Sequence, residues 1–286
     1  MNFPAESEII IAERAKLAYV LNPKAGCTSV LLALASLEGE NLERLYASQS
    51  LLLSREQTIH DSRLWTHLSK FSGDTIPNEF GVSEENGWLI FTIVRDPVRR
   101  LWSAWSDKIL EQTPWYSRQY GAEEWFPSTT PTCIEDIANQ FEIFVIALCQ
   151  KPDLLCDDAH WRPQIFNVFP NSISYGFIGS TPTLDKDLKR IGRHAASKIP
   201  TATQFNPLHS NRGNLPLISE FLNPGVFQKI IDLYAQDFSA LGIPLSLEPS
   251  TTSAFGNFLV NDSDNRYLNL MATLIERNQR LGDLGP

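Results

Sequence analysis

Two stretches of the chain share one pattern, in which an apolar run of strand length is followed by a short polar turn and an apolar segment of helix length. The first stretch consists of LAYVLN at 17–22, the turn PKAGCT and residues 29–37, with Gly39 just beyond them. Apolar residues lie all round the predicted helix and a glycine commonly follows a helix end, so we predict a buried helix that stops before Gly39. Strand, tight turn and buried helix indicate the opening of a βαβ unit.

The second stretch begins with WLIFTIV at 88–94. Asp96 and Pro97 then suit the N-cap and first position of a helix, and apolar residues recur at helical spacing as far as Ile109. Further along, the pattern predicts a short strand at 175–179 and helices at 134–149, 184–198 and 224–241. Strands that alternate with helices favour a parallel sheet covered on both faces. We therefore predict an α/β fold, a P-loop-like three-layer domain with a central parallel sheet flanked by helices.

Composition and charge narrow the class of protein. Hydrophobic residues make up 43% of the 286 residues and charged residues 20%, which indicates a folded globular protein. A formal net charge of −9 argues against nucleic acid or a heparin-like polymer as partner, because such binders usually carry a basic surface. A small anionic ligand is still compatible, since one local site can be positive on an acidic protein.

The cysteines and the longest apolar stretch bear on the compartment. The four cysteines form no C-x-x-C pair, which favours reduced thiols. The longest nearly uncharged apolar stretch, 30–37, is far shorter than the ~20 residues that span a bilayer. Because the N-terminal residues also lack the pattern of a signal peptide, we expect a cytoplasmic protein with no transmembrane segment.

The turn PKAGCTS at 23–29 carries the groups of a phosphate site. Gly26 lets the backbone approach a ligand closely, the helix N-terminus adds about half a positive charge, and Lys24 adds a full one. Thr28 and Ser29 supply hydroxyl donors. The turn is not a Walker A loop, in which the lysine follows the second glycine, because Lys24 precedes Gly26. On its own it also fits a tight connection before a core helix.

Arg95 marks a second candidate anion site. It ends the predicted strand 88–94 beside a helix N-terminus, and in open parallel sheets ligands bind outside the carboxyl ends of the strands. Ser103 follows two turns into the helix. The alternative is that Arg95 and Asp96 form only an ion pair and a helix cap.

Together, PKAGCTS and FTIVRDPVRRLWSAWSDK resemble the two segments that bind 3′-phosphoadenosine 5′-phosphosulfate (PAPS) in membrane-type carbohydrate sulfotransferases. The group concerned is sulfotransferase family 2, with the chondroitin 4-O- and HNK-1-type enzymes; heparan sulfate 2-O-sulfotransferases are more distant relatives. The similarity continues in order through DDAHWRPQIFNVFPNSISYGFIGSTPTLDKDL and FQKIIDLYAQDFSALGI, and covers about residues 17–245. The resemblance implies one sulfotransferase domain over 1–286, with 246–286 as a C-terminal extension.

The resemblance also implies a role for each matching position. Lys24 and the turn after it would hold the 5′-phosphosulfate, with Lys24 stabilising charge on the bridging oxygen. Arg95 and Ser103 would bind the 3′-phosphate that distinguishes PAPS from other adenine nucleotides, because arginine matches phosphate in a bidentate way. The reaction would be an in-line displacement onto a hydroxyl of a carbohydrate acceptor, and the family needs no metal. The implied cofactor contacts are Lys24, Ala25, Gly26, Cys27, Thr28, Ser29, Arg95, Ser103 and Arg212.

Histidines supply the candidates for the general base that accepts the proton of the hydroxyl group. His60, in IHDSRLWTHLSKF, stands where related enzymes have a histidine between the two binding segments, and is the first choice. His160 matches the HW pair of the family and is a candidate base, acceptor ligand or structural prop. His67 competes with His60 if the loop register differs by a turn. A purely structural histidine is the alternative for each.

The chain also departs from the family pattern. Ser180 follows FIG where the family often has lysine, so one positive contact is missing. The membrane anchor and luminal disulfides of the animal enzymes are not seen, and the net charge favours a neutral or weakly charged acceptor. The aromatic segment 114–131 predicts a surface excursion that lines an acceptor cleft, with packing anchors as the alternative.

Two rival functions share the strand, turn and helix. A P-loop kinase or NTPase would need a Walker lysine, which is absent from the turn, and Mg²⁺-dependent ATP turnover. A non-catalytic protein that retains the nucleotide site would bind the product, PAP, without turnover. The sequence does not identify the acceptor or the oligomeric state.

Overall fold

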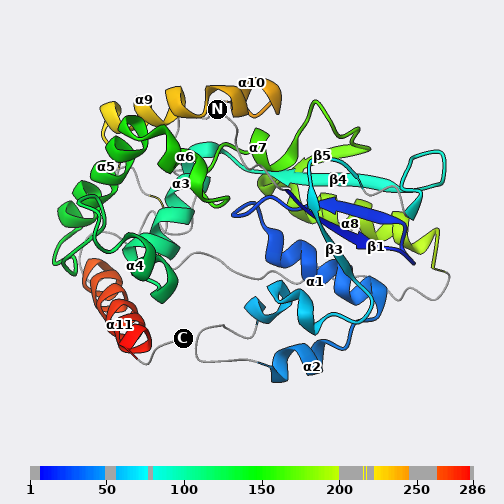
Figure 1. The fold of residues 1–286 in the computed structure, drawn as a ribbon, viewed down its shortest axis with the longest axis horizontal. Helices are drawn as coiled ribbons and strands as arrows, with labels where there is room; N and C mark the ends of the chain where they lie inside the picture. The colour runs from blue at the N-terminus through cyan, green and yellow to red at the C-terminus, as the bar shows by residue number, and fades with distance from the viewer. Residues whose placement is uncertain are drawn as a thin grey trace. The chain divides into compact units, whose positions relative to one another are not determined.

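The computed structural model describes residues 7–48, 56–76, 80–199, 215, 217, 222–244 and 263–283. The chain divides into two compact units, each made of several stretches. The first unit contains Met1–Arg95, Arg162–Arg212 and Ser239–Ile243, and it holds the β-sheet (Figure 1). The second contains Asp96–Trp161, Gly213–Phe238 and Pro244–Pro286, and its described part is helical.

The first unit is built on a five-stranded sheet in the order β3-β1-β2-β4-β5. Strands β2 (Leu17–Val20), β4 (Leu89–Val94) and β5 (Phe177–Ser180) are parallel, which confirms the predicted α/β class. β1 (Ser7–Ala12) pairs antiparallel with β2 and with β3 (Ser69–Gly73), so the sheet as a whole is mixed. The sequence patterns did not predict β1 and β3, because the apolar run of β1 is short and β3 (SKFSG) has little apolar content.

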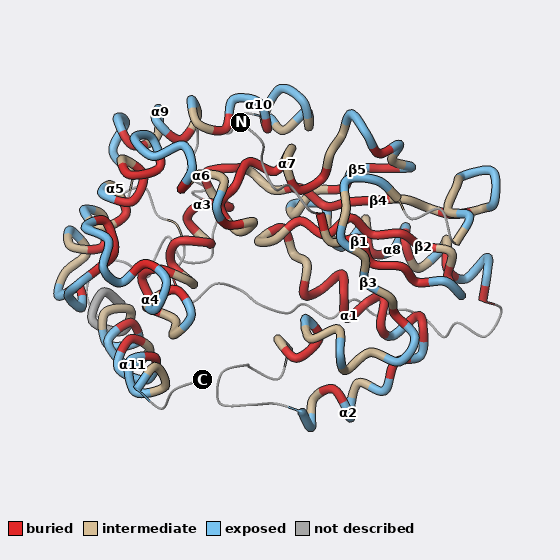
Figure 2. The backbone as a smooth tube through the Cα atoms, viewed as in Figure 1, coloured by how far each residue is buried: buried red, intermediate tan, exposed pale blue. Residues whose placement is uncertain are grey.

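The side-chain alternation of the strands gives this sheet two apolar faces. Ile10, Tyr19 and Phe91 lie on the face covered by α1 (Cys27–Glu38) and α8 (Leu184–Ala196). The opposite face is buried in a second cluster whose sheet residues include Ile9, Ile11, Ala18 and Val20. Figure 2 shows the middle strands and α1 buried over most of their length. The shorter helices of this unit are α2 (Leu42–Ala47), η1 (Glu56–His60), η2 (Ser62–Leu64), α7 (Ile165–Val168) and η5 (Thr181–Thr183).

The second unit surrounds an aromatic core that includes Trp102, Trp105, Phe141 and Trp161. Asp96 caps α3 as predicted, since its carboxylate accepts the N–H of Arg99 at 2.9 Å. The last helix, within the extension 246–286, contributes Met271 to the same core. The described elements of the second unit are α3 (Pro97–Trp105), the π-helical turn η4 (Ser106–Leu110), α4 (Pro114–Tyr120), α5 (Ile134–Gln150), α6 (Pro152–Asp157), α9 (Pro224–Leu233) and α11 (Ser263–Asp283); α10 (Ala235–Ala240) follows α9.

Among the described residues, each helix is too short or too polar to cross a membrane.

Candidate active site

The two predicted anion-binding segments leave the sheet from neighbouring strands. β2 and β4 pair in parallel, with Leu17 opposite Leu89 and Tyr19 opposite Phe91, so their carboxyl ends lie at the same edge. The guanidinium of Arg95 donates through Nη1 to the carbonyl oxygen of Lys24 at 3.0 Å. The prediction that these two segments lie side by side is confirmed.

The backbone of the turn at 23–29 is strongly curved. Lys24 and Gly26 both adopt left-handed backbone conformations, with φ of 65° and 80°. A lysine rarely takes this conformation, because its Cβ crowds the backbone, so a strained residue lies where a functional loop is predicted. Gly26 is the N-cap of α1, whose first turn points N–H groups out of the helix end.

Gly26 has two physical reasons to be glycine. Its φ of 80° lies in the region that disfavours any side chain. A Cβ at this position would also lie 3.0 Å from Cδ2 of Leu184 in α8. The turn therefore relies on a residue without a side chain where it packs closely against α8.

His60 lies against this turn. Its Nε2 is 2.9 Å from the hydroxyl oxygen of Thr28, and the imidazole is exposed although the preceding residue, Ile59, is fully buried. Trp65 fixes the local loop by donating its indole N–H to the carbonyl of Ile59 at 2.9 Å. The structure thus brings His60 to the predicted phosphosulfate turn.

His67 is placed differently. Its side chain is exposed, and its backbone N–H donates to the carboxylate of Glu40 at 2.6 Å. The same carboxylate accepts the N–H groups of Thr66 and Leu68 at 2.8 and 2.9 Å. Glu40, in the loop after α1, thus holds the backbone around His67. It is the ring of His60 that contacts Thr28 in the turn.

Ser180 ends β5 in register with Val94, next to Arg95 in sequence. Its backbone N–H donates to Asp187 at 3.1 Å, and its hydroxyl is 2.9 Å from that of Thr183. The third parallel strand therefore brings a hydroxyl group, in place of a lysine, to the edge of the sheet where β2 and β4 end.

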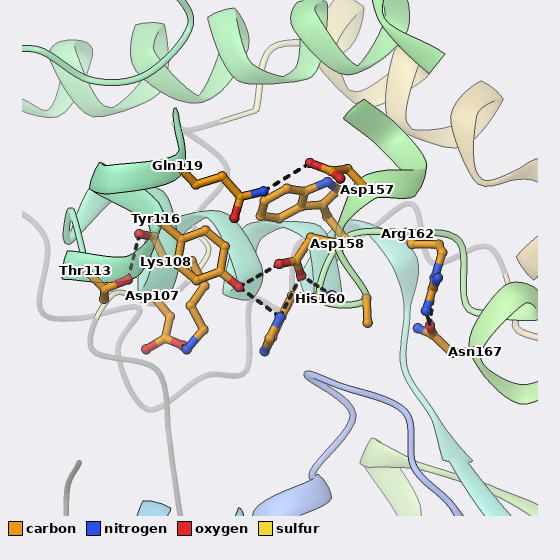
Figure 3. Close-up of polar contacts among 12 residues, drawn as sticks. Asp107, Lys108, Thr113, Tyr116, Gln119, Asp157, Asp158, His160, Arg162 and Asn167 are labelled. Carbon is orange, nitrogen blue, oxygen red and sulfur yellow. Dashed lines mark hydrogen bonds and ion pairs between the residues drawn. The ribbon is translucent and has the colours of Figure 1, made fainter. Parts of the chain in front are cut away.

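His160 belongs to the second unit and forms a compact polar cluster there (Figure 3). Its Nδ1 lies 2.7 Å from one oxygen of Asp158, and the hydroxyl of Tyr116 donates to the other oxygen at 2.9 Å. The carboxylate can only accept, so Nδ1 donates to it and the neutral ring carries its lone pair on Nε2. Trp161, fully buried and bonded through its indole N–H to Leu154, anchors the chain beside this histidine.

Titration of this cluster is set by burial and by the neighbouring groups. Burial would raise the pKa of the Asp158 carboxyl group, but the hydrogen bonds and charge of His160, together with Tyr116, lower it to about 2. Burial raises the pKa of the Tyr116 hydroxyl, and the neighbouring Asp158 charge raises it further. Tyr116 therefore stays protonated as a donor, and Asp158 stays ionised at neutral pH.

The remaining predicted residues have mixed outcomes. Ser103 lies half-buried in α3 of the second unit, and its role at the 3′-phosphate stays a prediction. Arg212 lies outside the described residues. Within the described part of the chain, no group of three or more candidate ligands is arranged for a metal ion.

The aromatic segment 114–131 is mostly core. Of the five aromatic residues in this segment, Trp115 is largely exposed, at 52%, and the other four are buried. The packing alternative therefore holds for those four. The buried four contribute to the aromatic cluster of the second unit and are Tyr116, Tyr120, Trp125 and Phe126.

Sequence reasoning missed the buried amides beneath the strand ends. Asn22 and Gln164 are both fully buried, and Gln164 contacts the backbone of Arg95. Neither amide belongs to a recognisable motif, and only the position of Asn22 at the end of an apolar run gave any signal.

Comparison with known proteins places the chain in a family. Residues 7–242 match the sulfotransferase family, and the chain belongs to it. Human carbohydrate sulfotransferase 9 is 26% identical over 249 residues, which cover 82% of this chain and 53% of that protein. Carbohydrate sulfotransferase 12 of Mus musculus is 24% identical over 268 residues, covering 83% of this chain and 60% of the relative. The resemblance predicted from the motifs is confirmed.

Other comparisons set the extent of the match. Carbohydrate sulfotransferase 14 of Danio rerio is 30% identical over 179 residues, covering 58% of this chain and 46% of the relative. The chain thus spans about half to three fifths of the length of these relatives. No solved structure matches it significantly.

Proposed function

We propose that this protein is a sulfotransferase that moves the sulfuryl group of PAPS to a hydroxyl group of a carbohydrate or glycoconjugate. The observation that carries the proposal is the contact between Arg95 and Lys24, which joins the two segments whose sequences resemble PAPS-binding segments. Both segments lie within the family match. The names of the relatives support a carbohydrate acceptor.

The turn at 23–29 and Arg95 would bind the 5′ and 3′ ends of the nucleotide, respectively. Lys24 and the N-terminus of α1 would surround the 5′-phosphosulfate, and Arg95 would bind the 3′-phosphate, with Ser103 and Arg212 as further contacts. In the transfer, the acceptor oxygen forms a bond to sulfur while the bond from sulfur to the bridging oxygen breaks. The bridging oxygen leaves with the electron pair on PAP, and Lys24 stabilises its growing charge.

A base must accept the proton of the acceptor hydroxyl, and the candidates are His60 and His160. His60 is the first choice because it contacts Thr28 in the phosphosulfate turn. His160 is the second, because Asp158 holds its Nδ1–H and thereby makes Nε2 the basic nitrogen, as in the carboxylate–histidine pairs of hydrolases. The chemistry of the proposed site needs no metal ion.

Nucleotide binding is the first test. We expect PAP to raise the melting temperature more than AMP or ADP, because only PAP carries the 3′-phosphate. Transfer from labelled PAPS to a panel of glycans and glycolipids then identifies the acceptor. Equal stabilisation by ADP and PAP would argue against a dedicated 3′-phosphate site and for the kinase or NTPase alternative.

Variants then separate binding from chemistry. Lys24→Ala should abolish measurable transfer, and Arg95→Ala should weaken PAP binding, with the fold intact in both. His60→Gln and His160→Gln are compared at saturating PAPS. Replacing the histidine that acts as the base should lower kcat by about 10²–10⁴-fold while the affinity of the variant for PAP is retained. A scaffold without activity would show no transfer in the wild type and no difference between these variants.

A further inference from the structure

Gln164 contacts Asn22 and Arg95, which follow the two strands that lead into the proposed PAPS-binding segments. Its Oε1 accepts the backbone N–H of Arg95 at 3.0 Å and the side-chain N–H of Asn22 at 2.8 Å. Its Nε2 donates to the carbonyl oxygen of Arg95 at 2.8 Å. The side chain has no solvent exposure. One amide therefore holds the peptide groups on both sides of the Arg95 Cα and also Asn22, two residues after the end of β2.

The network continues beneath the sheet edge. Asn22, itself fully buried, donates a second hydrogen bond from Nδ2 to the carbonyl of Ile93 at 3.0 Å. Its Oδ1 accepts from Asn167 at 3.4 Å, and the Oδ1 of Asn167 accepts two hydrogen bonds from Arg162 at 3.0 and 2.8 Å (Figure 3). Ser7 of β1 donates to the carbonyl of Asn167. The amides thus tie β4 and β2 to each other and to β1.

The chemistry of an amide explains why this position specifies one geometry. Two N–H groups occupy both lone pairs of the Gln164 oxygen. If the amide were turned by 180°, its own NH₂ group would face these two N–H groups, and no hydrogen bond could form between them. Buried polar networks of this kind favour one arrangement, because any other leaves desolvated groups without partners. Asn22 directly precedes the turn at 23–29, and Arg95 is the proposed 3′-phosphate ligand.

We propose that Gln164 is a positioning residue for the nucleotide site, which fixes Arg95 and the phosphosulfate turn at the separation that a 3′,5′-bisphosphorylated nucleotide requires. The inference rests on the proposed function. Its physical content is preorganisation: a ligand that meets two anion sites already in register loses less free energy in ordering them.

The test compares PAP with AMP, which differs from PAP only by lacking the 3′-phosphate. Gln164→Met keeps the length and volume of the side chain but removes its hydrogen bonds. Asn278→Leu is the matched control, because Asn278 is also buried and donates from its amide to the carbonyl of Glu111 at 2.7 Å in the second unit. Affinities for both nucleotides are measured by calorimetry on the full chain, beside Arg95→Ala and the double variant.

We expect Gln164→Met to lower the PAP-to-AMP affinity ratio by about tenfold or more, as expected when a charge-assisted contact is misplaced. The double variant should show the same ratio as Arg95→Ala alone, because Gln164 acts through Arg95. Asn278→Leu should lose stability but keep the wild-type ratio. If Gln164→Met weakens PAP and AMP equally, or only lowers stability as the control does, the positioning role is overturned.

Hydrogen exchange of the unliganded protein separates this outcome from failure of the proposed function. Gln164→Met should expose the amide of Arg95 to faster exchange while the amides of β1 stay protected. A wild type that does not distinguish PAP from AMP would refute the proposed function. Unchanged exchange of the Arg95 amide would by itself refute the positioning role of Gln164, whatever nucleotide the protein binds.

Discussion

Replacing Gly26 by alanine tests whether the strained turn binds the nucleotide. Alanine in a left-handed conformation costs about 1–2 kcal/mol, and Gly26 has a φ of 80°. The added Cβ would also approach Leu184 Cδ2 to 3.0 Å, which the flexible end of that side chain relieves only by moving. We therefore expect Gly26→Ala to lose about 1–2 kcal/mol of stability or to distort the turn.

Gly39, at the other end of α1, provides a matched control. It has a φ of 83°, and a Cβ there would lie 3.2 Å from the guanidinium of Arg14. Gly39→Ala should therefore cost a similar amount of stability at the opposite end of the same helix. Any difference between the two variants in nucleotide binding then reflects the turn itself.

The expected loss of binding follows from the hydrogen bonds of the turn. If Gly26→Ala displaces one N–H group from a charged phosphate oxygen, the loss is about 1.5–3 kcal/mol, or about 10- to 150-fold in PAP affinity. Urea unfolding followed by circular dichroism gives the stabilities, and calorimetry gives the affinities. A role of the turn in nucleotide binding is excluded if Gly39→Ala weakens PAP binding as much as Gly26→Ala does, or if Gly26→Ala binds PAP like the wild type.

Three further predictions concern other parts of the molecule. The pKa of Asp158 is about 2 in the folded protein, below its unfolded value, so its stabilisation of about 2 kcal/mol should be present above pH 4 and lost as pH falls toward 2; Asp158→Asn should remove this dependence in urea unfolding. Burial raises the pKa of Glu40, but the backbone N–H groups of residues 66–68 outweigh it and lower the pKa, so Glu40→Gln should cost about 1–3 kcal/mol at pH 7 and less at pH 3. Trp115 is exposed, so Trp115→Ala should raise the acceptor KM while the affinity for PAP and the urea midpoint stay unchanged; a lower urea midpoint would show a packing role.

The local elements could be predicted because their signals lie within a few residues. The expected strand at 17–22 appears as β2, and the helix that ends before Gly39 appears as α1. The expected cap at Asp96 is formed as well. Each depends on apolar periodicity, a capping carboxylate or a glycine, which act over one or two turns of chain.

The tertiary contacts of the site could be predicted only in part. Adjacent parallel strands explain why Arg95 meets Lys24, so that contact followed from the fold class. The pairing of His60 with Thr28 was consistent with the family position but needed the loop geometry to be established. For the aromatic residues at 114–131 the sequence left both an acceptor cleft and core packing open, because a sequence does not distinguish a sugar-stacking ring from a core ring.

By itself, the sequence determined the α/β class, the strand–turn–helix units and the family, because periodicity and short motifs are read from neighbouring residues. Only the tertiary structure decided that Gln164 holds both sides of Arg95 and that Tyr116 donates to the carboxylate of Asp158 beside His160. The first of these contacts joins residues 69 positions apart, and Tyr116 and Asp158 are 42 apart. Such partners are chosen by the burial of polar groups that must find hydrogen bonds wherever folding places them, and no local pattern records that choice.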